Sequence, residues 1–351
     1  NLHHFIDEGV EVTVVQPSEY HYYSGMGPGM LGSTYSPDDI RFATRQQVER
    51  KGGRFILDKA AVIDPENQRV TLEGSDTPLY YDVLSCNVGS YVPRELVDGQ
   101  GEHIFTAKPI EQLLPARQQI LTLASERSVN VAVVGSGPSA IEIAGNIRQL
   151  CRKQTVYPVA IQMFGGKNFM SGRPARVRSL TKKMLLRKGI EIIEGDYVSR
   201  ISGNTITLDS GKEYCADIIF PSLGVKPSPI FVKSGLPTGS DGGLLVNEYL
   251  QSTKYPNIFG GGDCVCFKPQ PLDKVGVYAV RQNPVLYGNL KASLAGAALE
   301  KFSPGGDYLL IYNLGDGEGV LSKWALTFSG KLAFVIKDFI DRRFIRAFQE
   351  T

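Results

Sequence analysis

A glycine-rich turn between an apolar run and a helix start constrains the fold of this chain more than any other feature. It lies in residues 131–144, which read VAVVGSGPSAIEIA. Gly135 and Gly137 permit a tight turn and a close approach of backbone N–H groups to a pyrophosphate, and Ala140 is small enough for close packing of helix on strand. The helix N-terminus adds the positive end of its dipole. A ligand-free turn is the alternative, but both flanks favour a βαβ unit that binds a dinucleotide.

Length and composition predict a globular chain of two or three domains. It has 351 residues, of which 42% are hydrophobic and 21% are charged. With 38 basic against 36 acidic side chains there is no excess charge that would attract nucleic acid, so a nucleic-acid partner is excluded. No apolar run is long enough to span a membrane and no secretory leader pattern is present, so the sequence predicts a cytoplasmic chain.

Cysteine and histidine usage argues against a disulfide framework and a metal site. The five cysteines are odd in number and contain no Cys-x-x-Cys pair. The four histidines have no metal-ligand spacing with them. Cys86 lies on an apolar run and is predicted to be a small buried hydrophobe. Cys264 and Cys266 could approach a cofactor, but a catalytic dithiol is the less favoured interpretation.

Strand and helix patterns alternate through the middle of the chain, which is typical of a doubly wound α/β sheet. The pattern predicts strands at 129–134, 159–164, 190–194 and 217–220, with helices at 139–152 and 174–188 between them. Before this region we expect a strand at 10–15, a glycine-rich loop at 20–32 and a helix at 37–51. The apolar strand that ends at Gly224 repeats the one that ends at Gly89. This repeat indicates an internal duplication and two different dinucleotides.

Several segments together resemble the FAD-dependent pyridine nucleotide-disulfide oxidoreductase superfamily, and they cover nearly the whole chain. The resemblance is to the branch with type II NADH dehydrogenases and sulfide:quinone reductases. The greatest likeness is to the NADH-dehydrogenase-like flavoprotein domain found alone or fused to selenide, water dikinase. The segments are YSGMGPG (23–29), YDVLSCNVGS (81–90), AKPIEQLL (107–114), VVGSGPSAIEIA (133–144), FGGGDC (259–264), KVGVYAVRQNPVLYGNL (274–290) and KDFIDRRF (337–344).

The resemblance implies an α/β fold with two doubly wound, Rossmann-like dinucleotide-binding domains, the second inserted in the first, plus a C-terminal segment. The implied FAD-binding domain comprises 1–108 and 236–300, the NAD(P)-binding domain 109–235, and a C-terminal interface segment 301–351. The family's first FAD fingerprint should precede Asn1. We therefore expect that about 20 to 30 residues, the size of a strand, turn and partial helix, belong before Asn1.

The resemblance also assigns roles to residues. Asp263, which follows Gly262, is the implied FAD ribityl anchor, Gly224 is implied to lie near the nicotinamide, and Glu142 is the implied catalytic residue near nicotinamide and flavin. Gln16 stands where many members carry an acidic ribose ligand and can still hydrogen-bond. The predicted cofactor-binding residues are Gln16, Gly89, Ser90, Gly262, Asp263, Gly135, Gly137, Ala140 and Gly224.

The implied function is oxidation of NAD(P)H through FAD, with electrons passed to an acceptor such as a quinone. Sulfide chemistry is disfavoured because no cysteine follows Cys266. A sulfur- or selenium-linked reductase and a degenerate, non-enzymatic interaction module stay open as alternatives. The choice between NADH and NADPH is also open. Basic residues after strand 159–164 could hold a 2′-phosphate, although a solvated helix face is the favoured interpretation; they are Lys167, Arg173, Arg176 and Arg178.

Residues 331–348 read KLAFVIKDFIDRRFIRAF and predict an amphipathic helix. Such a helix could lie in a membrane interface, which would make the chain peripheral at the cytoplasmic membrane. It could instead pack on a neighbouring domain or a second subunit. The mixture of acidic and basic residues favours protein packing, and a homo-oligomer is one form that this packing could take.

Overall fold

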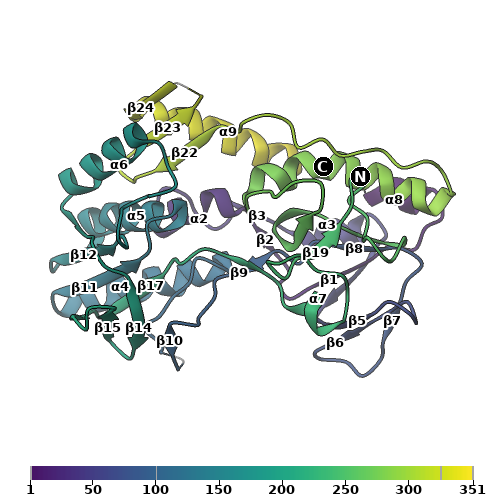
Figure 1. Cartoon of the computed structure of the whole chain (residues 1–351), viewed down its shortest axis with the longest axis horizontal. Helices are drawn as coiled ribbons and strands as arrows, with labels where there is room; N and C mark the ends of the chain where they lie inside the picture. Colours follow the sequence, from purple (N-terminus) through teal and green to yellow (C-terminus); the bar gives the residue numbers. More distant parts are fainter. Residues whose placement is uncertain (1, 100, 325, 350–351) are drawn as a thin grey trace. The chain divides into compact units, whose positions relative to one another are not determined.

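The computed structural model describes residues 2–99, 101–324 and 326–349. The chain folds into two compact units that contain both helices and strands (Figure 1), so the predicted α/β class is confirmed. Unit 1 comprises Asn1–His21, Ala43–Tyr91 and Val225–Gly306, and unit 2 comprises Tyr22–Phe42, Val92–Gly224 and Asp307–Thr351. The limits of these two units follow from contacts within the chain. The FAD-binding and NAD(P)-binding domains that the resemblance implies are defined instead by the cofactor that each would bind, and they stay a prediction.

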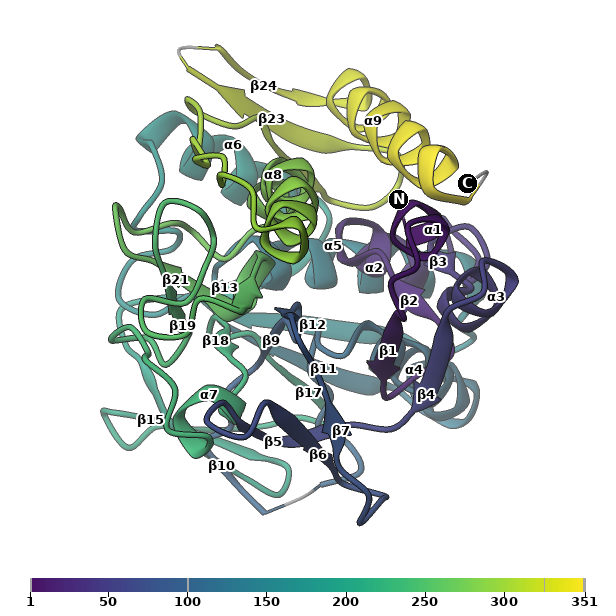
Figure 2. The same cartoon turned by 90° about the vertical axis from the view of Figure 1, so that its right-hand side faces the viewer.

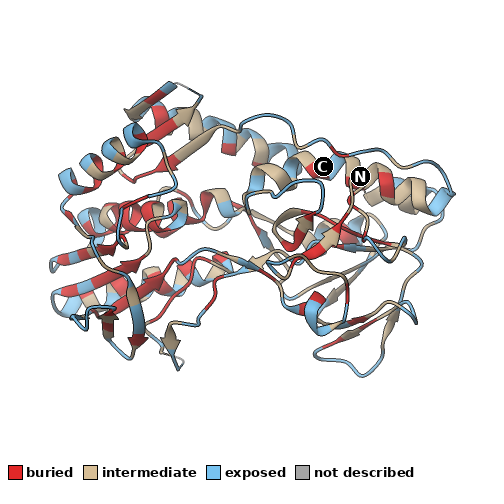
Figure 3. Ribbon diagram, viewed as in Figure 1, coloured by how far each residue is buried: buried red, intermediate tan, exposed pale blue. Residues whose placement is uncertain are grey.

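Unit 2 is built around a parallel four-stranded sheet in the order β13-β12-β11-β17. Nearly every residue of strand β11 is buried, as expected for a parallel sheet that helices cover. Buried residues are red in Figure 3. The predicted strands and helices of this region are confirmed to within two residues at each end. The elements are β11 Val129–Val134, α5 Pro138–Gln154, β12 Val159–Phe164, α6 Ala175–Arg187, β13 Ile190–Ile193 and β17 Ile218–Pro221.

Shorter elements of unit 2 surround this sheet. Before the sheet in chain order, a 3-10 turn leads directly into an α-helix that begins at Leu113. A second sheet, β10-β14-β15-β16, mixes one parallel and two antiparallel pairings. These elements are β10 Val97–Asp98, η2 Ile110–Gln112, α4 Leu113–Glu126, β14 Val198–Ser202, β15 Thr205–Leu208 and β16 Glu213–Cys215.

The prediction of a glycine-rich loop at 20–32 is wrong over residues 24–31. It forms a 3-10 turn, η1 Ser24–Met26, and a short helix, α2 Gly27–Leu31, in which every residue is buried. Small residues are needed here because α2 packs closely on neighbouring side chains: a Cβ at Gly29 would stand 2.5 Å from the Tyr35 ring. The glycines therefore serve packing rather than an open loop. Two short strands flank the segment, β2 His21–Tyr22 and β3 Arg41–Phe42.

The C-terminal part of unit 2 holds an antiparallel sheet that the sequence did not predict. Its strands are β22 Leu310–Asn313, β23 Gly319–Lys323 and β24 Leu326–Gly330, and helix α9 Lys331–Gln349 packs on them (Figure 2). The buried Lys188 ties this sheet to the end of α6, because its ammonium contacts Asp316 at 2.7 Å and Glu318 at 3.1 Å.

Helix α9 buries two charged side chains and leaves several large apolar ones exposed. The side chains of Lys337 and Asp341 are only 11% and 7% exposed. Leu332, Val335 and Phe339, by contrast, are 57% to 65% exposed. None of the helices in the described residues is long and apolar enough to cross a membrane. Contact of α9 with a membrane or a second subunit stays a prediction, and its outward face is where such a contact would form.

Unit 1 is built from short strand pairs, a three-stranded sheet of order β5-β6-β7 and one long helix, α8. Strand β1 runs parallel to β4 and β8 runs parallel to β20, around a core that includes Phe231, Phe259 and Leu244. The helix expected at 37–51 covers only the end of that range, because residues 36–40 form turns in which Asp39 caps Ser36. The elements are α1 Leu2–Asp7, β1 Thr13–Gln16, α3 Thr44–Arg50, β4 Arg54–Leu57, β5 Ala60–Asp64, β6 Arg69–Leu72, β7 Leu79–Tyr80, β8 Leu84–Cys86, β9 Ser90–Tyr91, β18 Lys226–Pro227, α7 Ile230–Lys233, β19 Leu244–Val246, β20 Ile258–Gly260, η3 Gly262–Cys264, β21 Val265–Phe267 and α8 Gly276–Ala295.

Candidate functional site

The fingerprint turn of unit 2 joins β11 to α5 and requires its first glycine. Gly135 has a φ of +125°, and a Cβ there would stand 2.3 Å from the carbonyl oxygen of Ser222. Gly137 differs: it has extended backbone with a φ of −75°, and a Cβ there would meet no protein atom within 4 Å. The surface over Gly137 is therefore open, as a cradle for a pyrophosphate must be.

The ends of β11 and β17 meet beside this turn. The Ser222 N–H donates to the Val134 carbonyl at 2.7 Å, and Gly224 follows with a φ of +90° and open space around it. Since β12 and β13 lie on one side of β11 and β17 on the other, this is the point of the sheet where the strand order reverses and ligands bind. The Ser222 hydroxyl is buried and has no hydrogen-bond partner in the described residues. These residues fit a dinucleotide.

Ala140 and Glu142 lie one turn into α5. Ala140 is fully buried, as close packing of helix on strand requires. The Glu142 carboxylate accepts the backbone N–H of Asn313 at 2.8 Å, so α5 is fastened to β22. Burial raises the pKa of Glu142 to about 7, although the positive charge of Lys337 and the Asn313 N–H oppose this rise. Glu142 can therefore hold or release a proton near neutral pH.

Glu142 belongs to a buried polar cluster with Lys337, Asp341 and Tyr23. The Lys337 ammonium donates to Asp341 at 2.8 Å and to the Gly25 carbonyl at 2.8 Å. The Tyr23 hydroxyl donates to the other oxygen of Asp341 at 3.2 Å. Sequence reasoning missed these three residues as site residues. The signal available was KDFIDRR itself, in which Lys337 and Asp341 are four residues apart and thus share one helix face.

Burial and opposite charges set the protonation of this cluster. Burial opposes the charge on Lys337, but the carboxylates of Glu142 and Asp341 outweigh it and raise the pKa of the lysine. Burial raises the pKa of Asp341, against the pull of Lys337. Burial and Asp341 together raise the pKa of Tyr23. The cluster therefore keeps its lysine protonated beside carboxyl groups that take up protons more readily than usual.

In unit 1 the structure brings Ser90 and Asp263 together. Strands β8 and β20 pair in parallel, so the residues that follow them meet at one edge. The Ser90 hydroxyl donates to Asp263 Oδ2 at 2.8 Å. Gly89, just before Ser90, has a φ of +64° and open space where a Cβ would stand. Two segments 173 residues apart thus form one polar edge that could hold a polyhydroxyl chain.

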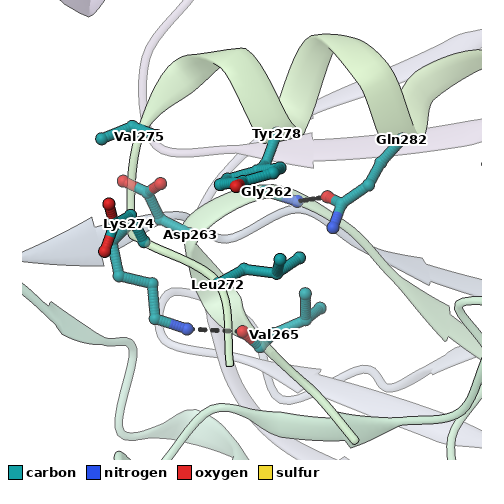
Figure 4. A pocket seen from close by; sticks show the side chains of 9 residues that line it. Gly262, Asp263, Val265, Leu272, Lys274, Val275, Tyr278 and Gln282 are labelled. Atoms are coloured by element: carbon teal, nitrogen blue, oxygen red, sulfur yellow. Dashed lines mark hydrogen bonds between the residues drawn. The ribbon is translucent and has the colours of Figure 1, made fainter. Parts of the chain in front are cut away.

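A small pocket adjoins Asp263, and Figure 4 shows the side chains that line it. Gly262, with a φ of +74°, donates its N–H to Gln282 Oε1 at 2.7 Å, which fixes this turn to α8. Lys274 donates to the Val265 carbonyl at 2.5 Å and also pairs with Asp241. The lining of the pocket therefore includes both a carboxylate, Asp263, and a lysine, Lys274.

Gln16 ends β1, but its amide is partly used within the following loop. Its nitrogen donates to the carbonyls of Ser18 at 2.6 Å and Tyr20 at 2.9 Å. A ribose hydroxyl would therefore have to donate to the amide oxygen. The role predicted for Gln16 stays a prediction.

The cysteines of unit 1 are poor nucleophiles in this structure. Cys86 and Cys264 are buried, and burial raises the pKa of Cys264 to about 11. The Cys264 thiol donates to the carbonyls of Cys86 and Gly261. Burial also raises the pKa of Cys266. All five cysteines are unpaired thiols, and the described residues contain no group that could hold a metal ion.

Comparison with known proteins gives concordant matches. The family model described as pyridine nucleotide-disulphide oxidoreductase matches residues 2–284. Ferroptosis suppressor protein 1 of Taeniopygia guttata is 28% identical over 288 residues, which cover 76% of this chain and 71% of that protein. The type II NADH:quinone oxidoreductase of Staphylococcus epidermidis is 24% identical over 375 residues, covering 96% and 89%.

A solved structure shows the same fold. NDH2 from Plasmodium falciparum in complex with NADH superimposes with a TM-score of 0.81 at 15% sequence identity, covering 96% of this chain and 92% of that one. At this identity the likeness concerns the fold alone. It agrees with the two dinucleotide-binding domains of Rossmann type that the sequence predicts.

Proposed function

Because the chain belongs to the pyridine nucleotide-disulphide oxidoreductase family, we propose that it is an enzyme that oxidises NAD(P)H through FAD and reduces a quinone. The reaction balances as NAD(P)H, one proton and a quinone giving NAD(P)⁺ and a quinol. The observation that carries the proposal is the open cradle over Gly137, at the reversal point of a parallel sheet.

The nucleotide would be held by unit 2. Backbone N–H groups at Gly137 and the start of α5 would bind the pyrophosphate, helped by the helix dipole. The buried hydroxyl of Ser222 would gain the partner that it lacks. Gly224, whose surface is open, would let the nicotinamide ring approach the backbone closely. These residues bind and orient the coenzyme; the hydride chemistry belongs to the cofactors.

FAD would be held by unit 1. When bound, FAD supplies a group that accepts a hydride and passes electrons on singly or in pairs. The carboxylate of Asp263 would accept hydrogen bonds from the ribityl hydroxyls, with Ser90 holding one carboxylate oxygen in place. Gly89 and Gly262 would let the backbone approach the cofactor without side chains in the way.

A quinone as acceptor is supported by the Staphylococcus epidermidis relative, a type II NADH:quinone oxidoreductase, and by the buried cluster in unit 2. Reduction of a quinone to a quinol consumes two protons. Lys337 is held protonated by Asp341 and Glu142, and Glu142 itself titrates near 7. We assign to this cluster the storage and transfer of protons for the acceptor, with Glu142 as the proton-carrying acid.

The alternatives gain less support. A sulfur- or selenium-linked reductase would use reactive thiols, and burial raises the pKa of both Cys264 and Cys266. An interaction module without activity would have no use for an open cradle and a titratable buried acid. Flavin reduction by NAD(P)H separates this second alternative from an enzyme.

Gly137→Val tests the proposal. Valine suits the extended backbone at this position, and its Cβ would meet no protein atom within 4 Å, so the variant should fold normally. Its side chain would fill the cradle. Since overpacking costs about 1–3 kcal/mol, kcat/KM for NAD(P)H with a soluble quinone should fall about tenfold or more. FAD affinity should not change. An unchanged kcat/KM would reject the assignment of this cradle to the coenzyme.

A further inference from the structure

The segment that follows β12 carries many basic side chains and no acidic ones. Residues 165–190 contain eight lysines and arginines and neither aspartate nor glutamate, although the net charge of the chain is only +2. Ion pairs to carboxylates engage Lys182, Arg187 and Lys188. Among the described residues no ion pair engages the other five, which are Lys167, Arg173, Arg176, Arg178 and Lys183. Basic side chains therefore outnumber carboxylates after the carboxyl end of β12, although Lys167 is close enough to Asp196 to lower the pKa of that carboxyl.

In a parallel dinucleotide-binding sheet, the residues that follow the strand in the position of β12 determine whether NADH or NADPH binds. A carboxylate there accepts the adenosine ribose 2′-OH, whereas a basic residue accommodates a 2′-phosphate. Here β12 ends at Phe164, whose carbonyl accepts the N–H of Gly135 in the fingerprint turn. Gly165 and Gly166 follow and have no side chains. Lys167 is thus the first side chain to project beyond the strand end.

The loop that carries Lys167 is fastened on both sides to the fingerprint turn. The Ser136 hydroxyl donates to the Gly165 carbonyl at 3.2 Å and accepts the N–H of Met170 at 3.1 Å. Phe169 and Met170 are buried, while Lys167 is exposed. A short, anchored loop loses little freedom when a ligand binds, which favours affinity.

The carboxylate that lies beside this strand end is already committed. A Cβ on Gly165 would stand 3.4 Å from Cγ of Glu194. One oxygen of Glu194 accepts the N–H of Phe169 at 2.9 Å, and the other pairs with Lys182. Burial opposes its charge, but these contacts and nearby Arg178 outweigh burial and lower its pKa. Glu194 thus holds the loop in place, and Lys182 neutralises the negative charge that would repel a phosphate.

We propose that this chain selects NADPH over NADH, and that Lys167 binds the 2′-phosphate while Arg178 adds positive potential. The proposal rests on the proposed function, since it names the coenzyme of that reaction. A 2′-phosphate carries a charge of about −1.5 to −2 near neutral pH. It would meet the exposed ammonium of Lys167 at a preformed loop. The two carboxylates near this loop already have partners: Glu194 pairs with Lys182, and Asp196 accepts the N–H groups of Tyr197 and Ser210.

Steady-state kinetics of the FAD-loaded protein test this with NADPH and NADH in turn. The wild type should have the higher kcat/KM with NADPH. Lys167→Gln removes a charged contact worth about 1.5–3 kcal/mol, so kcat/KM for NADPH should fall about 10- to 100-fold, mainly through KM. The value for NADH should stay within about twofold, since less than 0.5 kcal/mol is at stake. Lys183 is an exposed lysine of α6, and Lys183→Gln is the matched control. It should change kcat/KM for neither NADPH nor NADH.

Binding gives a readout that does not depend on turnover. Calorimetry should find that adenosine 2′,5′-bisphosphate binds the wild type more tightly than adenosine 5′-monophosphate, and that Lys167→Gln abolishes the difference. Equal binding of the two probes, or flavin reduction that favours NADH, would overturn the NADPH assignment and point to Glu194 as a 2′-OH acceptor. If neither nucleotide reduces the flavin, the proposed function fails, and the two probes still decide the 2′-phosphate site.

Discussion

The hydrogen bond from Ser90 fixes the orientation of the Asp263 carboxylate, to which we assign the binding of FAD. A carboxylate with one oxygen fixed at 2.8 Å keeps a constant orientation. Charged acceptors make stronger hydrogen bonds than neutral ones. A ligand hydroxyl would therefore bind Asp263 with little loss of side-chain freedom.

Asp263→Ala should weaken FAD binding, because it removes a charge-assisted hydrogen bond worth about 1.5–3 kcal/mol, which corresponds to about a 10- to 100-fold higher Kd. Fluorescence titration of the protein with FAD measures this. Ser90→Ala, which keeps the carboxylate and loses only its support, should have the smaller effect. Equal FAD affinity in the wild type and Asp263→Ala would show that this aspartate does not anchor the cofactor.

Glu142 makes the stability of the protein depend on pH. Its pKa is about 7 in the folded protein, raised by burial from an ordinary value of 4.5. Between these values the folded state binds more protons than the unfolded state, so the free energy of unfolding falls as the pH rises through this window. Below pH 4.5, Glu142 is protonated in both the folded and the unfolded state, so burying this side chain does not require the burial of a charge.

Glu142→Gln should remove this dependence. The free energy of unfolding of the wild type, relative to that of the variant, should be highest near pH 4.5 and should decline until about pH 7. Urea unfolding of both proteins at several pH values measures it. A constant difference across the window would mean that Glu142 is ionised in the folded protein throughout.

At the scale of elements, α9 is a helix whose charged side chains fasten it to the rest of its unit. Lys337 reaches the Gly25 carbonyl and Asp341 accepts from Tyr23, while Tyr35 donates to Asp338 at 2.8 Å. Aromatic contact between Tyr23 and Phe344 adds to this packing. Helix α9 is therefore held by these three polar contacts, which we call the polar seam, and most of its large apolar side chains face outward.

Lys337→Met should destabilise this packing strongly. Removing one partner of a buried ion pair leaves carboxylates uncompensated and costs about 3–5 kcal/mol. Lys331→Met, at the exposed start of the same helix, should cost within about 0.5 kcal/mol. Urea unfolding at pH 8 compares the two. Similar losses in both variants would contradict the polar seam as the main attachment of α9.

The same helix marks the limit of what the sequence predicts about elements. The 3.6-residue period of 331–348 correctly predicts a helix but does not tell which face turns inward. Apolar residues usually face the core, whereas here a cluster of compensating charges made burial of Lys337 and Asp341 possible. Partners from distant segments, Tyr23 and Glu142, supply that compensation, and no local pattern in the helix encodes them.

At the scale of the whole molecule, the alternating pattern predicted the parallel sheet of unit 2 well, since continuous apolar strands and glycine-ended turns are strong local signals. The predicted membership of the oxidoreductase superfamily is confirmed by the family match over residues 2–284. The three-stranded sheet β22-β23-β24 was missed. Its strands are only four or five residues long, and they are stabilised by packing on α5, α6 and α9.

Anaerobic titration of the FAD-loaded protein with NAD(P)H, followed by the visible absorbance of the flavin, tests directly whether hydride passes from the nicotinamide to FAD. We expect the absorbance to bleach with one equivalent of coenzyme, and to return when a quinone is added. In Gly137→Val the flavin should stay bound and bleach at least about tenfold more slowly. Bound flavin that NADH and NADPH both leave oxidised would contradict the central claim that this chain transfers hydride from a nicotinamide to FAD.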